Sequence, residues 1–303
     1  MTWKLKTSLL ILLFLPFLAS GQQLTSTSLV GQNLFDINPA AAGMYGRSAV
    51  SIRHRAQWGG FEGAPSWSFL SFHTPINQQL ALGFRVHQEE IAAFKSLNAS
   101  GGLAWKTPLR RGQLAFALEA GMQRLEIDQN ALIARDGNDA WLFTNQNNQS
   151  LFNMQFGVLY RSKKAFLGAS VQQLVPSSWG FIDDAEGTQV MHVHVHGGTK
   201  IPLNARLELR PNVNLRFVPE SFFHPEAQIG LNLDQRFTLG GGYRWSGDAY
   251  AMAEVQIKKS YRLAYLYEMS TGPLAALHNG THELFIGMLF GKLKSSSIKS
   301  FTP

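Results

Sequence analysis

The stretch Leu114-Ala-Phe-Ala-Leu-Glu-Ala-Gly-Met-Gln123 decides the fold class, because its character changes at every second residue. Its even positions, apart from Ala120, carry Leu, Phe or Met, and its odd positions carry Ala, Gly, Glu119 or Gln123. Side chains alternate between the two faces of a β-strand, whereas a helix repeats every 3.6 residues. The stretch therefore predicts a strand with one apolar face and one face that is small or polar.

The same alternation recurs along the chain in segments of about ten residues, which is the length of a tilted strand that crosses a bilayer. We count about fourteen such segments, an even number as in most single-chain bacterial barrels, at residues 47–58, 65–75, 79–90, 96–106, 113–124, 151–161, 165–175, 190–201, 205–218, 226–233, 236–245, 249–258, 260–269 and 281–290. Most are joined by short turns. The longer links near 125–150 and 176–189 are polar and acidic, as extracellular loops would be.

These features predict an all-β protein: a transmembrane antiparallel β-barrel of about fourteen strands. The strand length disfavours the alternative, a large periplasmic β-sandwich, because strands of soluble domains average about 5–6 residues. Arg85, Glu119 and Gln155 share their strand faces with Gly and Ala. A charged side chain facing lipid at mid-membrane costs about 2–4 kcal/mol, so we expect these three residues to face the lumen.

The two ends of the chain predict export and a short plug. Residues 1–21 combine two lysines, an apolar run and Ala19-Ser-Gly21, which is typical of a secretory signal peptide. Residues 22–46 are too polar and irregular to cross lipid, and we expect a periplasmic or plug segment. The barrel would span residues 47–290, and residues 291–303 form a basic C-terminal tail. The chain has no cysteine, so disulfide and thiol chemistry are excluded.

Three histidines, His192, His194 and His196, alternate with valines in the stretch 191–200. A metal site is one interpretation, since imidazole is a common metal ligand. Same-face neighbours on a strand are about 6.8 Å apart, however, so one tetrahedral ion would not gather all three, and a further ligand such as His87 would be needed. We favour neutral, hydrogen-bonding lumen residues and expect no metal and no cofactor.

No motif predicts an enzyme. His282-Glu283 begins like a zincin helix, but Ile286 stands where the second histidine would be, and the segment alternates as a strand. No spacing of serine, histidine and acid singles out a hydrolase site. Basic residues are scattered rather than clustered with aromatic ones, so nucleic-acid binding is not supported.

Two segments have residues typical of turns and of membrane-interface anchors rather than of a ligand site. Residues 34–43 contain Asn38-Pro39 and several alanines, which favour a turn and tight packing. Residues 55–66 place Trp58 and Phe61 where an aromatic girdle would meet the membrane interface. We expect structural roles for both segments.

The motifs along the chain resemble those of the PorP/SprF family of type IX secretion system membrane proteins. The resemblance covers about residues 29 to 290 in order and rests on four groups of residues: Asn38, Pro39, Ala40 and Gly43; Arg55, Gln57, Trp58, Gly63, Ala64 and Pro65; Tyr243, Arg244 and Asp248; and His282 and Glu283. Glu268 departs from the family pattern, where aspartate is commoner. The resemblance implies structural or partner-binding roles for these residues.

The resemblance further implies a non-catalytic outer-membrane barrel, exported through its signal peptide and embedded in outer-membrane lipids. Its expected partners are a type IX secreted substrate protein, bound through the C-terminal domain of that substrate, and periplasmic type IX components. The role would be secretion or surface anchoring of an adhesin or another substrate. The residues alone leave two alternatives open: a channel for small or apolar solutes and, more remotely, an outer-membrane hydrolase.

Overall fold

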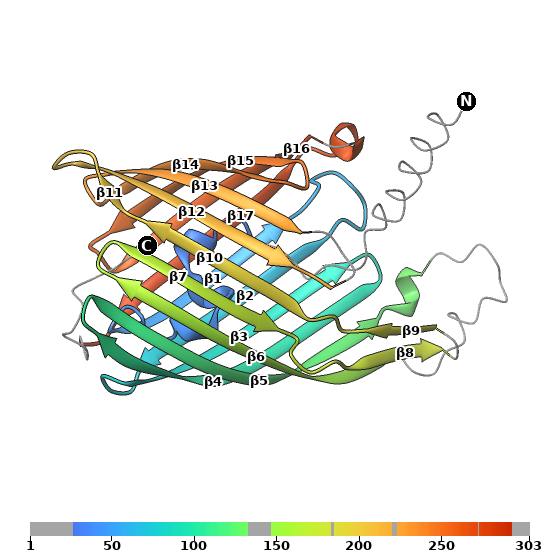
Figure 1. The fold of residues 1–303 in the computed structure, drawn as a ribbon. Coiled ribbons are helices and arrows are strands. Elements are labelled where there is room, and N and C mark those ends of the chain that lie inside the picture. Colours follow the sequence, from blue (N-terminus) through green and yellow to red (C-terminus); the bar gives the residue numbers. More distant parts are fainter. Residues whose placement is uncertain (1–26, 133–146, 183–184, 220–222, 272, 293–303) are drawn as a thin grey trace, which may run out of the picture.

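The computed structural model describes residues 27–132, 147–182, 185–219, 223–271 and 273–292 (Figure 1). The predicted signal peptide and nearly all of the predicted C-terminal tail lie outside these ranges. Within them, no helix is long and apolar enough to cross a membrane.

The fold is a closed antiparallel barrel of fourteen strands, as predicted. Strands that follow one another in the chain pair side by side, β1 pairs with β17, and β7 and β12 both pair with β10, so the sheet has no open edge. The strands are β1 (Ser48–Ala56), β2 (Ser66–Pro75), β3 (Leu80–Ile91), β4 (Phe94–Leu109), β5 (Gly112–Ile127), β6 (Asn148–Ser162), β7 (Ala165–Gln172), β10 (His192–Thr199), β12 (Leu207–Phe217), β13 (His224–Leu233), β14 (Phe237–Arg244), β15 (Asp248–Ile257), β16 (Tyr261–Ser270) and β17 (Thr281–Phe290).

Three shorter strands were not predicted as separate elements. Two-residue β11 (Ile201–Pro202) pairs with β12, and β8 (Ser178–Ile182) pairs with β9 (Ala185–Thr188) in a separate hairpin. The hairpin falls within the polar link at 176–189, which lacks an alternating pattern long enough to predict strands. It extends beyond the barrel beside β6, where the Gln149 side chain accepts a hydrogen bond from the backbone N–H of Gly180 at 3.0 Å.

The outer face of the barrel is apolar and the inner face is polar, as the alternation predicts. On β5, Leu118 is 48% exposed whereas its neighbour Glu119 is 1% exposed. Large apolar side chains that point outward occur on strands all around the barrel: Ile52, Leu70, Phe84, Leu97, Leu103, Leu118, Phe156, Leu167, Val213, Ile229, Leu239, Leu263 and Ile286. Such a belt of apolar residues is the face that a barrel presents to lipid.

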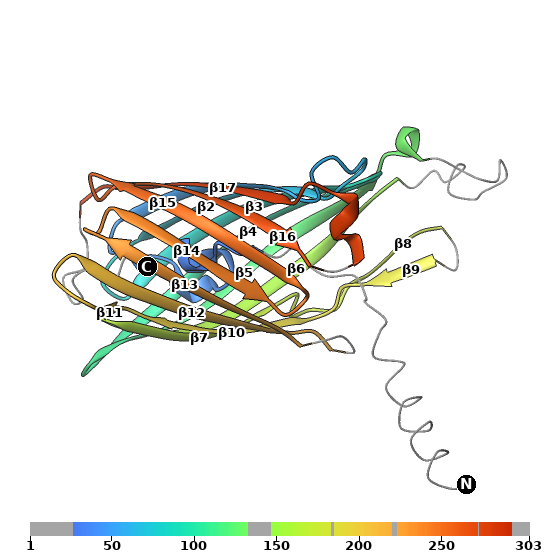
Figure 2. The ribbon, with the colours of Figure 1, turned by 90° about the horizontal axis from the view of Figure 1, so that it is seen from above.

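The two ends of the barrel differ in their connections (Figures 1 and 2). Short connections at one end, which we call the turn end, include residues 110–111, 163–164 and 234–236. The opposite end, which we call the loop end, carries the longer connections, among them 57–65, 128–147 and the β8–β9 hairpin. This asymmetry is typical of outer-membrane barrels, whose periplasmic turns are short and whose extracellular loops are long.

Residues 27–46 lie inside the barrel, and we call them the plug (Figure 1). They form three short 3-10 turns: η2 (Val30–Gln32), η3 (Leu34–Asp36) and η4 (Pro39–Ala41). The plug runs from the loop end, where Thr27 contacts Arg53 near the end of β1 and Glu283 near the start of β17, to the turn end, where β1 begins. Most residues of the plug are buried.

An apolar core joins the plug to one side of the barrel. Leu34, Phe35 and the alanines of η4 pack against small lumen-facing residues of β3, β4 and β5, such as Ala81, Ala104 and Ala117. The small side chains leave the volume that the plug fills. This packing explains why alanine and glycine alternate with bulky outward residues in these strands.

Candidate functional site

The seat of the plug in the barrel wall is the most elaborate set of contacts in the described residues, and it has two different sides. Glycines form the first side. A Cβ atom added to Gly83 would lie 2.4 Å from the Phe35 ring, and one added to Gly157 would lie 2.1 Å from Oδ1 of Asn38. Both distances are far below a normal contact, so at these positions only glycine admits the plug.

Asn38 holds the plug to this glycine side. Its side-chain Nδ2 donates to the backbone carbonyl oxygens of Val158 at 3.0 Å and Ala169 at 3.2 Å, and it lies 3.2 Å from Nε2 of His196. Its Oδ1 accepts a hydrogen bond from the N–H of Ala40 at 2.9 Å and thereby caps η4. Pro39, at the first position of η4, supplies a φ suited to the turn.

Gly43, near the end of the plug, has a left-handed backbone conformation, at φ +66°. Its N–H donates to Nδ1 of His73 at 2.9 Å, and its neighbours include Ala81 and Lys106. Glycine is required here both by the positive φ and by the close approach of the wall. The family-motif residues Asn38, Pro39 and Gly43 thus all fix the path of the plug.

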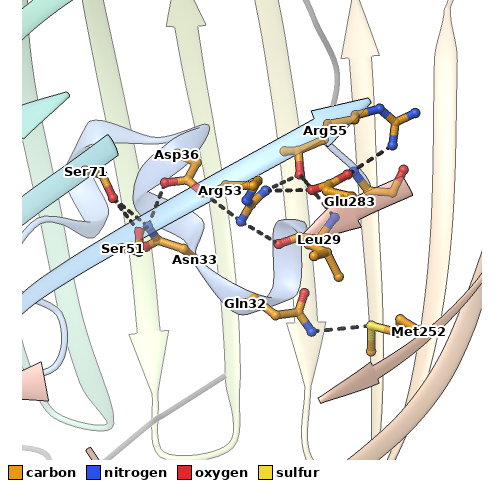
Figure 3. Close-up of polar contacts among 12 residues, drawn as sticks. Leu29, Gln32, Asn33, Asp36, Ser51, Arg53, Arg55, Ser71, Met252 and Glu283 are labelled. Atoms are coloured by element: carbon orange, nitrogen blue, oxygen red, sulfur yellow. Dashed lines mark hydrogen bonds and ion pairs between the residues drawn. The ribbon is translucent and has the colours of Figure 1, made fainter. Parts of the chain in front are cut away.

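Buried ion pairs form the second side of the seat (Figure 3). Arg53 of β1 lies 2.7 Å from Asp36 of the plug and 3.4 Å from Glu283 of β17. It also donates to the plug at the carbonyl oxygen of Leu29, at 3.0 Å. Arg53 is 1% exposed, so these charges interact out of contact with bulk water, where Coulomb interactions are strong.

Arg55, two residues along β1, bridges two carboxylates from neighbouring strands. It pairs with Glu283 at 3.0 Å and with Glu268 of β16. The plug joins this cluster through Ser28, whose hydroxyl donates to Glu268 at 2.9 Å. Each of these carboxylates lies beside an arginine, and an unpaired buried charge would be strongly unfavourable.

Arg244 extends the cluster to the far strands. It lies 3.5 Å from Glu268, 3.6 Å from Asp248 and 3.7 Å from Glu226, and it donates to the hydroxyl of Ser28. Residues separated by about 200 positions in the chain therefore meet at one place. We call these charged residues the ionic cluster: Asp36, Arg53, Arg55, Glu226, Arg244, Asp248, Glu268 and Glu283.

Arg85, Glu119 and Gln155, the three residues predicted to face the lumen, also come together in the structure. The Arg85 guanidinium donates to Glu119 at 2.8 Å and to Gln155 at 2.8 Å, from three different strands. It also donates to the plug backbone, at the carbonyl oxygens of Phe35 and Asp36, both at 3.0 Å. The prediction of their orientation is confirmed, and the contact shows their role: they hold the middle of the plug.

A cavity of ≈ 100 Å³ lies in the lumen between the plug and the loop end, and we call it the vestibule. Asp36 and Ile37 of the plug line it, and its walls come from the parts of β2, β3, β4, β6, β7, β10 and β12 that lead to the loop end. Two further cavities among the described residues are each ≈ 10 Å³.

The remaining family-motif residues lie away from the plug. Gln57, Trp58, Gly63, Ala64 and Pro65 form the β1–β2 connection at the loop end, where the N–H of Gln57 donates to the carbonyl oxygen of Pro65 at 2.9 Å. The Trp58 ring lies 6.4 Å from that of Phe61 and 6.1 Å from that of His278. This connection lies at the rim of the barrel, at the loop end.

Tyr243 and His282 point outward instead. Tyr243 is 46% exposed, and Nδ1 of His282 lies 2.6 Å from the hydroxyl of Tyr265 on the outer face of the barrel. The family motifs thus fall into three groups: residues that seat the plug, residues that shape one rim loop and residues on the outer face.

The alternating histidines face the lumen as predicted. His192, His194 and His196 are all buried, Nδ1 of His194 lies 3.4 Å from Oδ1 of Asn214, and Nε2 of His196 contacts Asn38. In the described part of the chain, no three histidine or carboxylate side chains converge in a metal-binding arrangement. His87, the proposed further ligand, instead contacts the rings of Trp67 and Phe69 on β2.

Sequence reasoning did not single out Asp36, Arg53, Ser28 or Glu226 as site residues. The signal for Arg53 was present, because Arg53 and Arg55 occupy alternate positions on a strand whose intervening residues face outward. Chemically, the cluster consists of three arginines and five carboxylates, and each carboxylate lies beside at least one arginine. It presents no activated nucleophile and is suited to holding the plug in place.

Comparison with known proteins now identifies the family. Residues 19–288 match the family described as type IX secretion system membrane protein PorP/SprF. The chain belongs to the PorP/SprF family. The match covers the plug and every barrel strand up to most of β17, which agrees with the resemblance seen in the motifs. No curated protein matches the sequence.

Several solved membrane barrels are similar to this one at low sequence identity. The Acinetobacter baumannii outer-membrane protein Omp33 has a TM-score of 0.48 at 7% identity, over 80% of this chain and 98% of that one. A mutant of the TodX monoaromatic hydrocarbon channel has a TM-score of 0.49 at 10% identity, over 89% of this chain and 95% of that one. The translocator domain of the autotransporter NalP from Neisseria meningitidis has a TM-score of 0.42 at 10% identity, over 81% and 88%.

Proposed function

We propose that this PorP/SprF barrel is a non-catalytic outer-membrane component that supports secretion or surface anchoring of a partner protein, and that it binds the C-terminal domain of this partner at the loop end. The observation that carries the proposal is the seated plug. A lumen closed by buried ion pairs and tight packing is unsuited to continuous solute flow. Family membership supports a role in type IX secretion.

The loop end offers the surface for such a partner. The β8–β9 hairpin projects there beyond the barrel, and the connections 57–65 and 271–280 lie at the same end (Figure 2). Loops carried on a rigid scaffold are common binding elements, since their sequence can vary without disturbing the fold. The turn end, with its short connections, offers less surface for a protein ligand.

The test is capture of type IX substrates from the bacterium that encodes this chain. A C-terminally tagged barrel is isolated from native membranes, and the proteins that accompany it are identified by mass spectrometry. We expect one or a few secreted proteins with a type IX C-terminal domain. Deletion of the gene should remove the same proteins from the cell surface while general permeability is unchanged.

Two matched variants locate the binding surface. Replacement of residues 178–188 by a short Gly-Ser link should abolish capture, whereas a Gly-Ser insertion between Asn204 and Ala205 at the turn end should not. Equal capture by both variants would place binding elsewhere, and absence of any type IX substrate with the parent protein would refute the proposal.

The same preparations separate binding from solute transport. In planar bilayers, the parent barrel should show no stable conductance, and a variant lacking residues 27–42 should conduct. Stable conductance or solute uptake through the parent protein would favour the channel alternative.

A further inference from the structure

The turn end carries positive charge that is not balanced by acidic residues. The connections at this end are residues 76–79, 110–111, 163–164, 200–206, 234–236 and 258–260, together with 291–292 after β17. Their exposed basic residues are Arg110, Arg111, Lys163, Lys164, Arg206, Arg236, Lys258, Lys259 and Lys292. The one acidic residue in these connections is Asp234, which pairs with Arg206 at 2.6 Å.

Exposed basic side chains at the loop end, by contrast, have acidic neighbours. Lys95 lies 3.2 Å from Asp128, and Arg124 lies 3.7 Å from Glu126. Within the described part of the chain, the exposed basic residues of the turn end form no such ion pair, apart from Arg206. Uncompensated charge of one sign creates a potential that attracts a ligand of the opposite sign, so the turn end favours an anionic partner.

The basic residues form a ring around the barrel rather than a patch on one side. The strands that finish at the turn end are β2, β4, β6, β10, β13, β15 and β17. Of the connections that follow these strands, only residues 76–79 contain no basic residue. Because these strands are spread around a closed barrel, the charges surround its circumference. A ring fits a lipid leaflet, which surrounds the barrel, better than a folded protein that docks on one side.

The ring lies where the apolar outer face ends. Leu109, which is 47% exposed, directly precedes Arg110, and Phe237, which is 54% exposed, directly follows Arg236. Basic side chains one residue beyond the apolar face lie at the level of the lipid headgroups. Lysine and arginine can place their apolar stems along the acyl chains there and extend their charges to the headgroups.

Two neighbouring hairpins carry the densest part of the ring. The pairing of β5 with β6 reaches Gly112 and Ser162, so the tips of the β4–β5 and β6–β7 hairpins lie side by side. Each tip consists of two exposed basic residues, and we call the four the basic quartet: Arg110, Arg111, Lys163 and Lys164. None of the four pairs with a carboxylate of the described residues.

We propose that the turn end binds the phosphate groups of anionic phospholipids in the leaflet next to it, and that the basic quartet is its strongest site. Guanidinium and ammonium groups donate charge-assisted hydrogen bonds to phosphate oxygens. Trp105 of β4 and Leu167 of β7, which are exposed on the outer face, would contact the acyl chains. This surface lies at the opposite end from the proposed partner site and does not depend on it.

The test uses the purified full-length barrel in vesicles of phosphatidylglycerol and phosphatidylcholine, in equal amounts and with the same acyl chains. Native mass spectrometry of the barrel released from these vesicles counts the lipids of each kind that stay bound. We expect phosphatidylglycerol to be enriched at least about threefold over phosphatidylcholine at low salt, because its headgroup has a net negative charge. The enrichment should fall as added salt screens the charges.

Variants locate the site. Arg110→Gln with Arg111→Gln should lower the enrichment, and glutamine at all four positions of the basic quartet should remove most of it. Lys95→Gln with Arg124→Gln removes two charges at the loop end, and this matched control should retain the enrichment of the parent. Heat-modifiable migration on gels checks that each barrel is folded. The salt dependence of the parent tests the proposal even if a glutamine variant does not fold.

Three results would overturn the proposal: the parent retains both lipids equally, the quartet variant keeps the full enrichment, or inorganic phosphate at the concentration of the lipid displaces it completely. An acidic protein that accompanies the parent but not the quartet variant, without lipid enrichment, would assign the turn end to a protein partner instead. The proposed function is judged separately by capture of substrates at the loop end, which the quartet substitutions should leave unchanged.

Discussion

The two sides of the plug seat hold the same segment by different physics. On the side of β1, β16 and β17, buried arginines and carboxylates pair across strands, as Arg55 does with Glu268 and Glu283. On the side of β3 and β6, glycines remove side-chain volume so that Phe35 and Asn38 approach the wall. One side depends on charge and the other on shape.

This difference predicts different responses to mutation. A buried ion pair contributes little relative to an apolar pair of similar volume, but removal of one partner leaves a charge that is desolvated and uncompensated. Tight packing around a glycine is destabilised by added volume instead, since an added methyl group forces the neighbouring residues to move. Each side of the plug seat can therefore be tested by its own substitution.

The largest effect is expected for Arg55→Met. Glu268 and Glu283 would each lose a partner, and we expect the free energy of unfolding to fall by about 3–5 kcal/mol. Arg55→Lys keeps the charge but cannot bridge two carboxylates through separate nitrogens, so its free energy of unfolding should lie between those of Arg55→Met and the parent. Denaturant unfolding of the refolded barrel, followed by tryptophan fluorescence, measures the difference; a change below about 1 kcal/mol would contradict a structural role for the cluster.

The same variant should loosen the plug. Asp36 is the only aspartate in residues 27–46, so cleavage there by a protease that cuts before aspartate reports plug release. We expect cleavage in Arg55→Met and none in the parent, where Asp36 is buried. If both chains resist equally, the ionic side does not control release.

A smaller effect is expected on the glycine side. Gly157→Ala would place a Cβ atom 2.1 Å from Oδ1 of Asn38, and overpacking of this kind costs about 1–3 kcal/mol. Asn38→Ala removes the clash, so the double variant should be more stable than the sum of the two single changes predicts. Gly197→Ala, whose Cβ would meet its neighbours at 3.3 Å or more, is the control. If the two changes in the free energy of unfolding were strictly additive, Gly157 and Asn38 would not be in the close contact that the structure shows.

The barrel was predictable from the sequence because its signal is local. Each strand alternates by itself, and outward residues such as Leu118 differ plainly from inward ones such as Glu119. Strand ends were less accurate: β4 and β5 are longer than predicted, because their pairing continues at both ends beyond the alternating segments. The β8–β9 hairpin carries no alternating signal and was missed.

The site was predictable only in part because its contacts are not local. The alternation shows that Arg85, Glu119 and Gln155 face inward, but the register that brings them together depends on three strand pairings. The same is true of Arg55 and Glu283, which are 228 residues apart. The plug adds a further difficulty, since Asp36 lies in a segment without periodic structure whose position only the closed barrel defines.

The smallest effect is expected at the exposed pair of Arg206 and Asp234, which supplies the contrast to the buried cluster. Arg206 donates two hydrogen bonds to Asp234, at 2.8 and 2.6 Å, yet its side chain is 71% exposed. The hydrogen bond from Arg206 lowers the pKa of Asp234. The stabilisation from this pair is therefore present above the usual pKa of aspartate and is lost as the pH falls through the lowered value. Solvent and salt screen such a pair, so Arg206→Gln should unfold as the parent does at neutral pH and moderate salt. If this variant were destabilised as much as Arg55→Met, burial would not be the property that separates the two arginines.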